Sequence, residues 1–288
     1  MFRALRNGWR LLRMAVSFAR HDALFPLESL GIAPALIAWA RLFAPRGDTR
    51  RPGERLAAAL QDMGPSFIKL GQALSTRADL LSEEVAADLA RLQDHIPAFP
   101  GAEARRIIET ELGQPLAAVF SSFDDVPVAA ASIAQVHFAV TTDGRDVAVK
   151  VLRPGIGKAF EQDLDLFYWM AELVERTQPR FRRLKPVESV RAFADVVRVE
   201  MDLRMEAAAA EELGENFADD PNYRAPRIDW DRTAERVMTQ ERVDGIPIGD
   251  RDAIIAAGHD PHEIMRKCAE AFFYQVFRDG FFHADMHG

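Results

Sequence analysis

Hydrophobic residues along the chain follow two different spacings, and each predicts a different secondary structure. Apolar positions recur every three or four residues over 55–112, which is the spacing of a buried helical face. The same spacing returns over 159–176 and over 186–217. A last helix is predicted over 261–279, where Gly280 is suited to end it. These segments predict a largely helical protein.

Short runs rich in β-branched residues interrupt the helical pattern. Two of them, over 132–140 and 146–151, are separated by a segment that contains Asp143-Gly144. Asp-Gly between such runs is a strong short-range signal for a β-hairpin. A third run, over 236–243, alternates like a strand. Helices, strands, a helix, a strand and a helix in this order predict the α+β class.

The first 20 residues form a basic, amphipathic segment. If these residues form a helix, apolar side chains spaced by four and three positions lie on one face of it. They are Leu5, Trp9, Leu12, Val16 and Ala19. Two placements fit this pattern: a helix packed on the domain with solvated arginines, or a helix lying on an anionic membrane surface. The apolar stretch over 30–40 contains Pro34 and is shorter than the roughly 20 residues that a membrane-spanning helix needs.

Composition excludes several classes of protein. The chain has 288 residues, of which 48% are hydrophobic, so it can form two lobes or one large domain with a real core. Its formal charge of -8 argues against nucleic acid as the main partner. The single cysteine, Cys268, cannot form an internal disulfide, and no sequence typical of a cleaved export signal begins the chain. We therefore expect a cytoplasmic location.

Lys150 ends the second strand of the predicted hairpin, directly after three buried-type residues. Burying a lysine is costly unless anions compensate, so this position predicts a carboxylate partner and a phosphate. Val-Ala-Val-Lys is also the pattern of the third strand of protein kinases. A strand-end lysine that extends to solvent is the alternative.

Three acids lie in the long helix predicted after the hairpin. Asp202 and Glu206 are four residues apart and share a face, whereas Glu200 points elsewhere. Two acids on one face repel each other unless cations meet them, and Lys150 and Lys69 are candidate cations. A solvated acidic face is the alternative.

Lys69 and Gln72 are neighbours on one face of a helix predicted to begin near Pro65. Gly71 lies between them, and a glycine inside a helix costs about 1 kcal/mol relative to alanine. Its presence predicts that another backbone approaches closely there, with simple packing as the alternative.

An alanine-rich segment, Ala129-Ala130-Ala131-Ser132, occupies the place between the first two strands where a protein kinase has its Gly-rich phosphate loop. No G-x-G-x-x-G pattern is present. Alanine side chains hinder the close approach of backbone to phosphate, so we expect a nucleotide to sit differently here.

The carboxyl-terminal residues contain a second candidate site. His283, Asp285 and His287 stand at every second position after the apolar pair Phe281-Phe282. These residue types coordinate zinc or iron, so a metal site is one interpretation and a purely structural role is another.

These motifs, taken in order, resemble the UbiB/AarF family of atypical protein-kinase-like proteins, which is associated with ubiquinone biosynthesis. The resemblance covers roughly residues 55–288. The segments that carry it are Lys69-Leu70-Gly71-Gln72, Ala129 to Ser132 with Ile133-Ala134-Gln135-Val136-His137, Val149-Lys150, Glu200-Met201-Asp202 with Glu206, and His283-Ala284-Asp285.

The resemblance implies a protein-kinase-like fold, with a small β-containing amino-terminal lobe, the start of a helical carboxyl-terminal lobe, and an amino-terminal helical extension. Lys150 would pair with Glu206 and hold the nucleotide phosphates, and Asp285 would be the catalytic aspartate. Lys69, Gln72, Glu200 and Asp202 would occlude the active site against a protein substrate. The residues expected at ATP are Val128, Ala129, Ala130, Ala131, Ser132, Ile133, Ala134, Lys150, Glu206, Gln240 and Arg242, the last two on a hinge strand.

The expected domain organisation follows from these motifs. A basic helical segment over 1–45 precedes the helical extension over 54–116, which carries the Lys-x-Gly-Gln motif. The kinase-like amino-terminal lobe extends to the hinge over 117–245, and the carboxyl-terminal lobe begins over 246–288.

One departure from the kinase pattern affects the expected activity. The chain ends at Gly288, before the magnesium-binding asparagine and the Asp-Phe-Gly-type segment of a kinase. We therefore expect a truncated chain without metal ligands, which binds magnesium-ATP poorly and is inactive by itself. The absent part would include any membrane-anchoring carboxyl-terminal segment.

For the full-length protein, the resemblance implies an ATP- and Mg²⁺-dependent kinase or ATPase that supports ubiquinone biosynthesis. Its partners would be ATP, lipid or polyprenyl-quinone precursors and quinone-biosynthesis proteins, and it would contact the inner membrane peripherally from the cytoplasm. A non-catalytic scaffold with a nucleotide-shaped pocket is the alternative, and a metal-dependent hydrolase is a weaker one.

Overall fold

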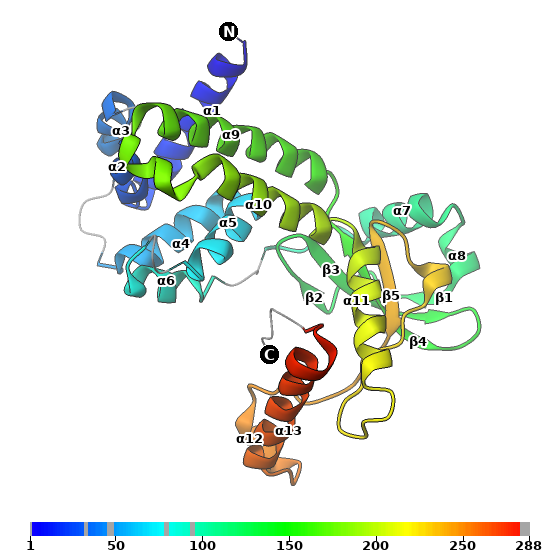
Figure 1. Cartoon of the computed structure of the whole chain (residues 1–288). Coiled ribbons are helices and arrows are strands. Elements are labelled where there is room, and N and C mark those ends of the chain that lie inside the picture. Colours follow the sequence, from blue (N-terminus) through cyan, green and yellow to red (C-terminus); the bar gives the residue numbers. More distant parts are fainter. Residues whose placement is uncertain (1, 32–33, 45–48, 78–80, 93–95, 283–288) are drawn as a thin grey trace. The chain divides into compact units, whose positions relative to one another are not determined.

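The computed structural model describes residues 2–31, 34–44, 49–77, 81–92 and 96–282. Helices dominate, and one antiparallel sheet accompanies them (Figure 1). The chain divides into two compact units, one made of Met1–Phe99, Ala129–Gln135 and Leu152–Met201, the other of Pro100–Val128, Val136–Val151 and Asp202–Gly288. The chain thus passes between the units several times.

The first unit is almost entirely helical. Its elements are α1 (Phe2–Arg20), α2 (Phe25–Leu30), α3 (Pro34–Ala40), η1 (Arg41–Phe43), α4 (Pro52–Met63), α5 (Pro65–Ser75), α6 (Glu83–Leu89), β2 (Ala129–Ala130), α9 (Ile156–Thr177), η2 (Pro179–Leu184) and α10 (Pro186–Glu200). In Figure 1, α9 and α10 lie side by side as an antiparallel pair. No helix among the described residues is both long and apolar enough to span a bilayer.

One apolar core holds these helices together. Phe67 of α5 meets Phe167 of α9 edge to face, with ring centroids 5.1 Å apart. Each fully buried side chain of this size contributes about 1.5–3 kcal/mol relative to an exposed one. The largest members of the core are Leu11, Met14, Phe18, Leu24, Leu27, Ile37, Leu56, Leu60, Phe67, Leu89, Leu92, Leu164, Leu166 and Phe167.

Helix α1 buries one side in the first unit and leaves part of its other apolar face exposed. It buries Leu11, Met14 and Phe18, whereas Trp9, on the apolar face that fitted either the domain or a membrane surface, is 63% exposed. A second apolar stripe, one position along the helix, provides the larger contact surface. Two arginines expected to be solvated are paired with α9: Arg6 with Asp165 at 2.7 Å, and Arg10 with Asp163 at 3.3 Å.

The second unit combines the sheet with helices. Its elements are α7 (Gly101–Leu112), α8 (Leu116–Val119), β1 (Phe120–Phe123), most of β3 (Ala134–Thr141) and β4 (Asp146–Leu152), α11 (Leu203–Asn216), η3 (Trp230–Arg232), β5 (Val237–Glu241), α12 (Arg251–Ala256), α13 (Pro261–Phe273) and η4 (Tyr274–Asp279). The strand order is β1-β3-β4-β5, and β2 pairs with β3. The predicted hairpin is thus present as β3 and β4.

The long helix predicted over 186–217 is instead two helices. Helix α10 ends at Glu200, and α11 begins at Leu203. The side chain of Asp202 accepts a hydrogen bond from the backbone N–H of Arg204, and the N–H of Leu203 donates to the carbonyl of Glu235 at 2.8 Å. An aspartate that caps a new helix competes with continuation of the preceding one, which explains the break.

The last helix lies where the sequence predicted it. Helix α13 continues into the π-helical turn η4, and Gly280 ends it in the left-handed conformation with φ of +66°. Within the described residues, α13 has no fully buried side chain, and Met265, Phe273 and Phe277 are 60%, 54% and 80% exposed. The apolar side of this helix is therefore uncovered in the chain as it stands.

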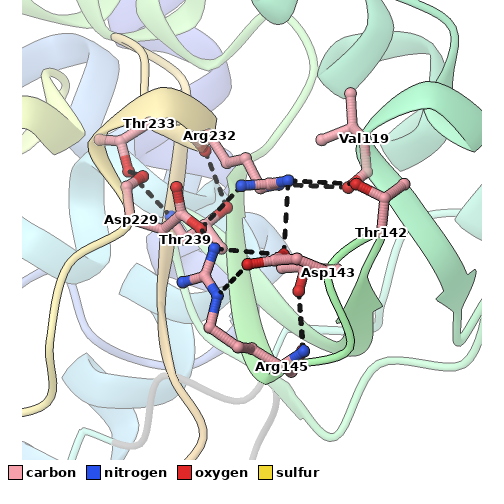
Figure 2. Close-up of polar contacts among 9 residues, drawn as sticks. Val119, Thr142, Asp143, Arg145, Asp229, Arg232, Thr233 and Thr239 are labelled. Atoms are coloured by element: carbon pink, nitrogen blue, oxygen red, sulfur yellow. Dashed lines mark hydrogen bonds and ion pairs between the residues drawn. The ribbon is translucent and has the colours of Figure 1, made fainter.

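A buried aspartate ties the hairpin to the segment before β5 (Figure 2). Asp229 accepts from Arg145 at 2.7 Å and from Arg232 at 3.0 Å. Arg145 also pairs with Asp143 in the hairpin turn, and this guanidinium lowers the pKa of the Asp143 carboxyl. Arg232 donates to the carbonyl of Val119 at 3.1 Å. The network joins α8, the hairpin and η3 to one another.

The same segment fixes the position of β5. Thr239 in β5 donates its hydroxyl to the carbonyl of Arg232 at 2.7 Å, and its backbone N–H donates to the hydroxyl of Thr233. The hydroxyl of Thr233 in turn donates to the carbonyl of Asp229 at 2.8 Å. The strand predicted to be the hinge is therefore held by both its ladder with β4 and these threonines (Figure 2).

His137 is a fully buried titratable group in β3. Its Nδ1 lies 2.7 Å from the carbonyl of Asp124, and its ring stacks on Phe123 with centroids 4.8 Å apart. Burial lowers the pKa of the imidazole, while the Asp124 carbonyl and the charge of Asp125 act in the opposite direction. With Nδ1 as the donor to this carbonyl, the neutral ring is the form that the fold favours.

We expect the variant Asp229→Ala to lower the free energy of unfolding by about 3 kcal/mol, because it leaves the largely buried Arg232 guanidinium without its carboxylate. Urea denaturation of the 288-residue chain measures this loss. The matched control is Asp195→Ala, which breaks an exposed pair with Arg198 at 2.7 Å and should cost only a small fraction of that amount. Equal costs for both variants would contradict the structural role of the network.

We expect His137 to destabilise the fold in acid. Its folded pKa lies below its unfolded value of about 6.5, so its contribution is complete above that pH and is lost as the pH falls through it. Replacing it in His137→Gln should reduce the loss of unfolding free energy between about pH 7.5 and about pH 5.5. Urea denaturation at the two pH values measures this difference, and an equal loss in both proteins would contradict the role of His137.

Candidate functional site

Lys150 is a partly exposed cation in an otherwise buried part of β4. Its neighbours Val149 and Val151 are fully buried, whereas 26% of the lysine side chain is exposed. In the ladder with β5 it lies opposite Met238. The strand thus places the ammonium group at the edge of an apolar layer, where an anionic partner is needed.

Glu206 provides that partner. Its two carboxylate oxygens accept hydrogen bonds from the Lys150 Nζ at 2.6 and 2.8 Å. Glu206 lies in the first turn of α11, where the helix dipole stabilises a negative charge. The structure therefore brings together the strand lysine and the helix glutamate, as the sequence predicted.

Lys69 and Glu200 form a second pair, in the first unit. Lys69 of α5 lies 3.0 Å from the carboxylate of Glu200, the last residue of α10, and the exposed fractions of the two side chains are 17% and 33%. Gln72 lies one turn further along α5, and its carbonyl accepts from Ser75. The partner of Asp202 is Arg204, at 2.7 Å in the second unit. Arg204 lowers the pKa of that carboxyl.

Gly71 makes room for side chains, not for another backbone as expected. A Cβ at this position would lie 2.5 Å from Leu92 Cδ1 and 2.8 Å from Leu60 Cδ1. Leu60 and Leu92 belong to the apolar core of the first unit. The glycine in the Lys-x-Gly-Gln motif is therefore explained by packing of α5 against α4 and the residues after α6.

The alanine-rich segment is a short, tightly bonded loop. Ala129 and Ala130 form β2, the N–H of Ala131 donates to the carbonyl of Ala134 at 2.8 Å, and Ser132 and Ile133 are buried. Val128, just before it, is 50% exposed. This loop lacks glycine, and hydrogen bonds hold it in place.

Gln240 and Arg242 lie at the end of β5. Gln240 is opposite Ala148, and the N–H of Arg242 donates to the carbonyl of Asp146 at 3.3 Å. The guanidinium of Arg242 lies over the ring of Phe138, 3.9 Å from its centroid. These contacts attach the predicted hinge to the hairpin that carries Lys150.

The predicted catalytic residue Asp285, with His283 and His287, lies outside the described residues. Elsewhere in the described chain no cluster of three or more His, Cys, Asp or Glu side chains is suited to a metal ion. The expected role of Asp285 remains a prediction.

Sequence reasoning missed Arg153. It is only 9% exposed and donates to the carbonyl of Ala131 through two nitrogens, at 3.0 and 2.8 Å. No local signal marks its burial, because arginine side chains are mostly exposed.

A strand lysine paired with a glutamate of a following helix, in a unit that joins helices to an antiparallel sheet, defines the protein-kinase-like class. Residues 91–288 match the family described as the ABC1 atypical kinase-like domain. The chain belongs to this family. The match confirms the α+β, kinase-like fold that the sequence predicted.

Relatives extend the match over the whole chain. Proteins named "Probable protein kinase UbiB" are 46% identical in Marinobacter nauticus, 42% in Vibrio cholerae and 41% in Pseudomonas putida, and cover 96%, 98% and 99% of this chain. The matched regions are 51%, 52% and 53% of those proteins. The chain therefore spans about half the length of these relatives, and the predicted resemblance to the UbiB/AarF family is confirmed.

A solved structure is similar as well. It is that of Rv3197 from Mycobacterium tuberculosis in complex with erythromycin, which superposes with a TM-score of 0.57 at 30% identity. The superposition covers 79% of this chain and 57% of that chain.

A double-mutant cycle tests the Lys69–Glu200 pair. We expect Lys69→Met and Glu200→Gln to show a coupling of about 1–3 kcal/mol in the free energy of unfolding, because both side chains are largely withdrawn from water. The control cycle uses Lys185 and Glu188, an exposed pair at 2.9 Å, whose coupling should be much smaller. Additive effects at Lys69 and Glu200 would mean that the pair does not hold α5 to α10.

Proposed function

We propose that this chain carries the nucleotide-binding part of an atypical kinase or ATPase, and that the whole protein uses ATP in support of ubiquinone biosynthesis at a membrane. The proposal rests on the two hydrogen bonds from the Lys150 Nζ to the carboxylate oxygens of Glu206, at 2.6 and 2.8 Å. The family membership and the relatives named UbiB support it.

The geometry at Lys150 fits a phosphate. An ammonium group has three donors, and two of them go to Glu206. The third is left for a phosphate oxygen, and the exposed quarter of the side chain gives access from solvent. Glu206 would orient the ammonium group, so that Lys150 contacts the phosphates as a fixed point charge.

The other predicted roles follow from this placement. Ala129 to Ala134 would form the loop at the phosphates, Gln240 and Arg242 the hinge beside adenine, and Asp285 the base that accepts a proton from the attacking group. Mg²⁺, when bound, would neutralise charge on the phosphates. No cluster of three or more His, Cys, Asp or Glu side chains in the described residues is suited to hold it.

Lys69, Gln72, Glu200 and Asp202 would restrict access to the active site. The partly buried bond between Lys69 and Glu200 supports a fixed position for the motif helix α5. Such an obstruction would exclude a protein substrate and favour ATP hydrolysis or a small lipid acceptor, such as a polyprenyl-quinone precursor.

Helix α1 would provide a peripheral contact with the membrane. Its buried stripe leaves Trp9 exposed and Leu12 and Val16 only partly buried, with Arg13 and Arg20 exposed beside them. An apolar stripe flanked by cations suits the surface of an anionic bilayer, although two other arginines are bound to α9.

Lys150→Met tests the nucleotide site. In this chain joined to the carboxyl-terminal half of the Marinobacter nauticus relative, we expect the variant to weaken magnesium-ATP binding by about 10- to 100-fold in calorimetry, because a charged hydrogen bond of about 1.5–3 kcal/mol is lost. The control Lys158→Met removes an exposed lysine on α9 and should leave the affinity unchanged. Equal affinities of Lys150→Met and the unmodified protein would refute the proposed site.

The scaffold alternative differs in one outcome. If the protein acts by ATP turnover, Asp285→Asn should abolish its support of quinone synthesis in cells that lack the native gene. Normal quinone content with Asp285→Asn, together with intact ATP binding, would instead support a non-catalytic scaffold.

A further inference from the structure

The alanine loop is held by one buried arginine. Besides its two bonds to the carbonyl of Ala131, Arg153 donates to the carbonyl of Pro97 at 2.9 Å and to that of Ile96 at 3.1 Å. Its own backbone N–H donates to the carbonyl of Ile133 at 2.8 Å. One residue thus binds both sides of the loop and the segment 96–99, all within the first unit.

Carbonyl oxygens alone compensate this guanidinium. No carboxylate lies within ion-pair distance of Arg153 among the described residues, and burial lowers its pKa. Burying a charge costs several kcal/mol unless its donors are satisfied, so the side chain is tolerated only while these carbonyls stay in place. The arginine and the carbonyls therefore fix each other.

A second side chain reinforces the attachment. Gln135, just after the loop, donates to the carbonyl of Phe99 at 3.2 Å and accepts from its N–H at 3.0 Å. The Phe99 ring also lies under the guanidinium of Arg153, 5.8 Å from its centroid. Segment 96–99 follows the helices that carry Lys69, so it connects that part of the chain to the loop.

The contacts that the loop makes by itself are incomplete. The hydroxyl of Ser132 is buried and has no hydrogen-bond partner in the described structure, which is unfavourable by itself. A loop of alanines also lacks the glycine backbone conformations that let a kinase phosphate loop fold over its nucleotide. Besides its own backbone bond from Ala131 to Ala134, its shape therefore depends on the outside residues bonded to it.

We propose that Arg153 is the positioning residue of the alanine loop, clamping residues 131–133 to segment 96–99 and so setting how tightly the site holds a nucleotide. Arg153 follows by three residues the lysine proposed to bind phosphate, and β4 ends between them. The effect on nucleotide affinity rests on the proposed function, whereas the clamping of the loop does not.

Hydrogen–deuterium exchange of the 288-residue chain tests the clamp directly. The variant Arg153→Lys keeps the positive charge but loses the planar set of guanidinium N–H donors. We therefore expect hydrogen exchange in peptides covering 128–133 to accelerate by about tenfold or more, while exchange in α4 and α9 stays unchanged. The control is Arg182→Lys, which loses one bond to the carbonyl of Glu175 away from the loop. Unchanged exchange at the loop in a folded Arg153→Lys variant would overturn the proposal.

A second variant applies if Arg153→Lys does not fold. Gln135→Met keeps the volume but removes both bonds to Phe99, and it should loosen the same peptides to a smaller extent. Ser132→Ala removes a hydroxyl without a partner, so its loop should exchange no faster than the original. Equal protection in Gln135→Met and the unmodified chain would overturn the proposal.

The nucleotide consequence is measured separately, in the fusion with the relative's carboxyl-terminal half. A positioning role predicts that Arg153→Lys raises the KM for ATP by about tenfold while kcat changes little, a split that general destabilisation would not produce. A faster-exchanging loop with unchanged KM would overturn the link to affinity. Absence of ATP binding in the unmodified fusion would refute the proposed function and leave the exchange result to decide the clamp.

Discussion

The position of one lysine sets the arrangement of the second unit. Lys150 stands between two fully buried valines in β4, and an ammonium group cannot stay there without an anion. The anion is Glu206, which requires α11 to begin close to β4 and to present its first turn. The burial of β4 and the ion pair between Lys150 and Glu206 therefore constrain where α11 begins.

Asp202 links this constraint to the chain before it. It ends one helix and caps the next, so the three acids expected on one helix are distributed over two. Glu200 pairs with Lys69 and Glu206 with Lys150, and each carboxylate meets a different cation. The break thus explains how closely spaced acids avoid mutual repulsion, without the shared face that a continuous helix would impose.

Much of the fold and part of the candidate site were predictable from local pattern. The hairpin, the start of α5 at Pro65 and the end of the last helix at Gly280 follow from turn and capping residues, which act over a few positions. Lys150 was recognisable because a charge in an apolar strand is costly. The buried face of α1 was not, because that helix has two apolar stripes and only its neighbours select one.

By itself, the sequence determined the hairpin and most of the helical segments, the α+β class, and that Lys150 needs an acid, since these depend on propensity, periodicity and the cost of burying charge. Only the tertiary structure decided why Gly71 is a glycine and that Arg153 is buried among carbonyls. Those outcomes depend on groups 11 to 57 residues apart in the chain, whose proximity no local pattern encodes.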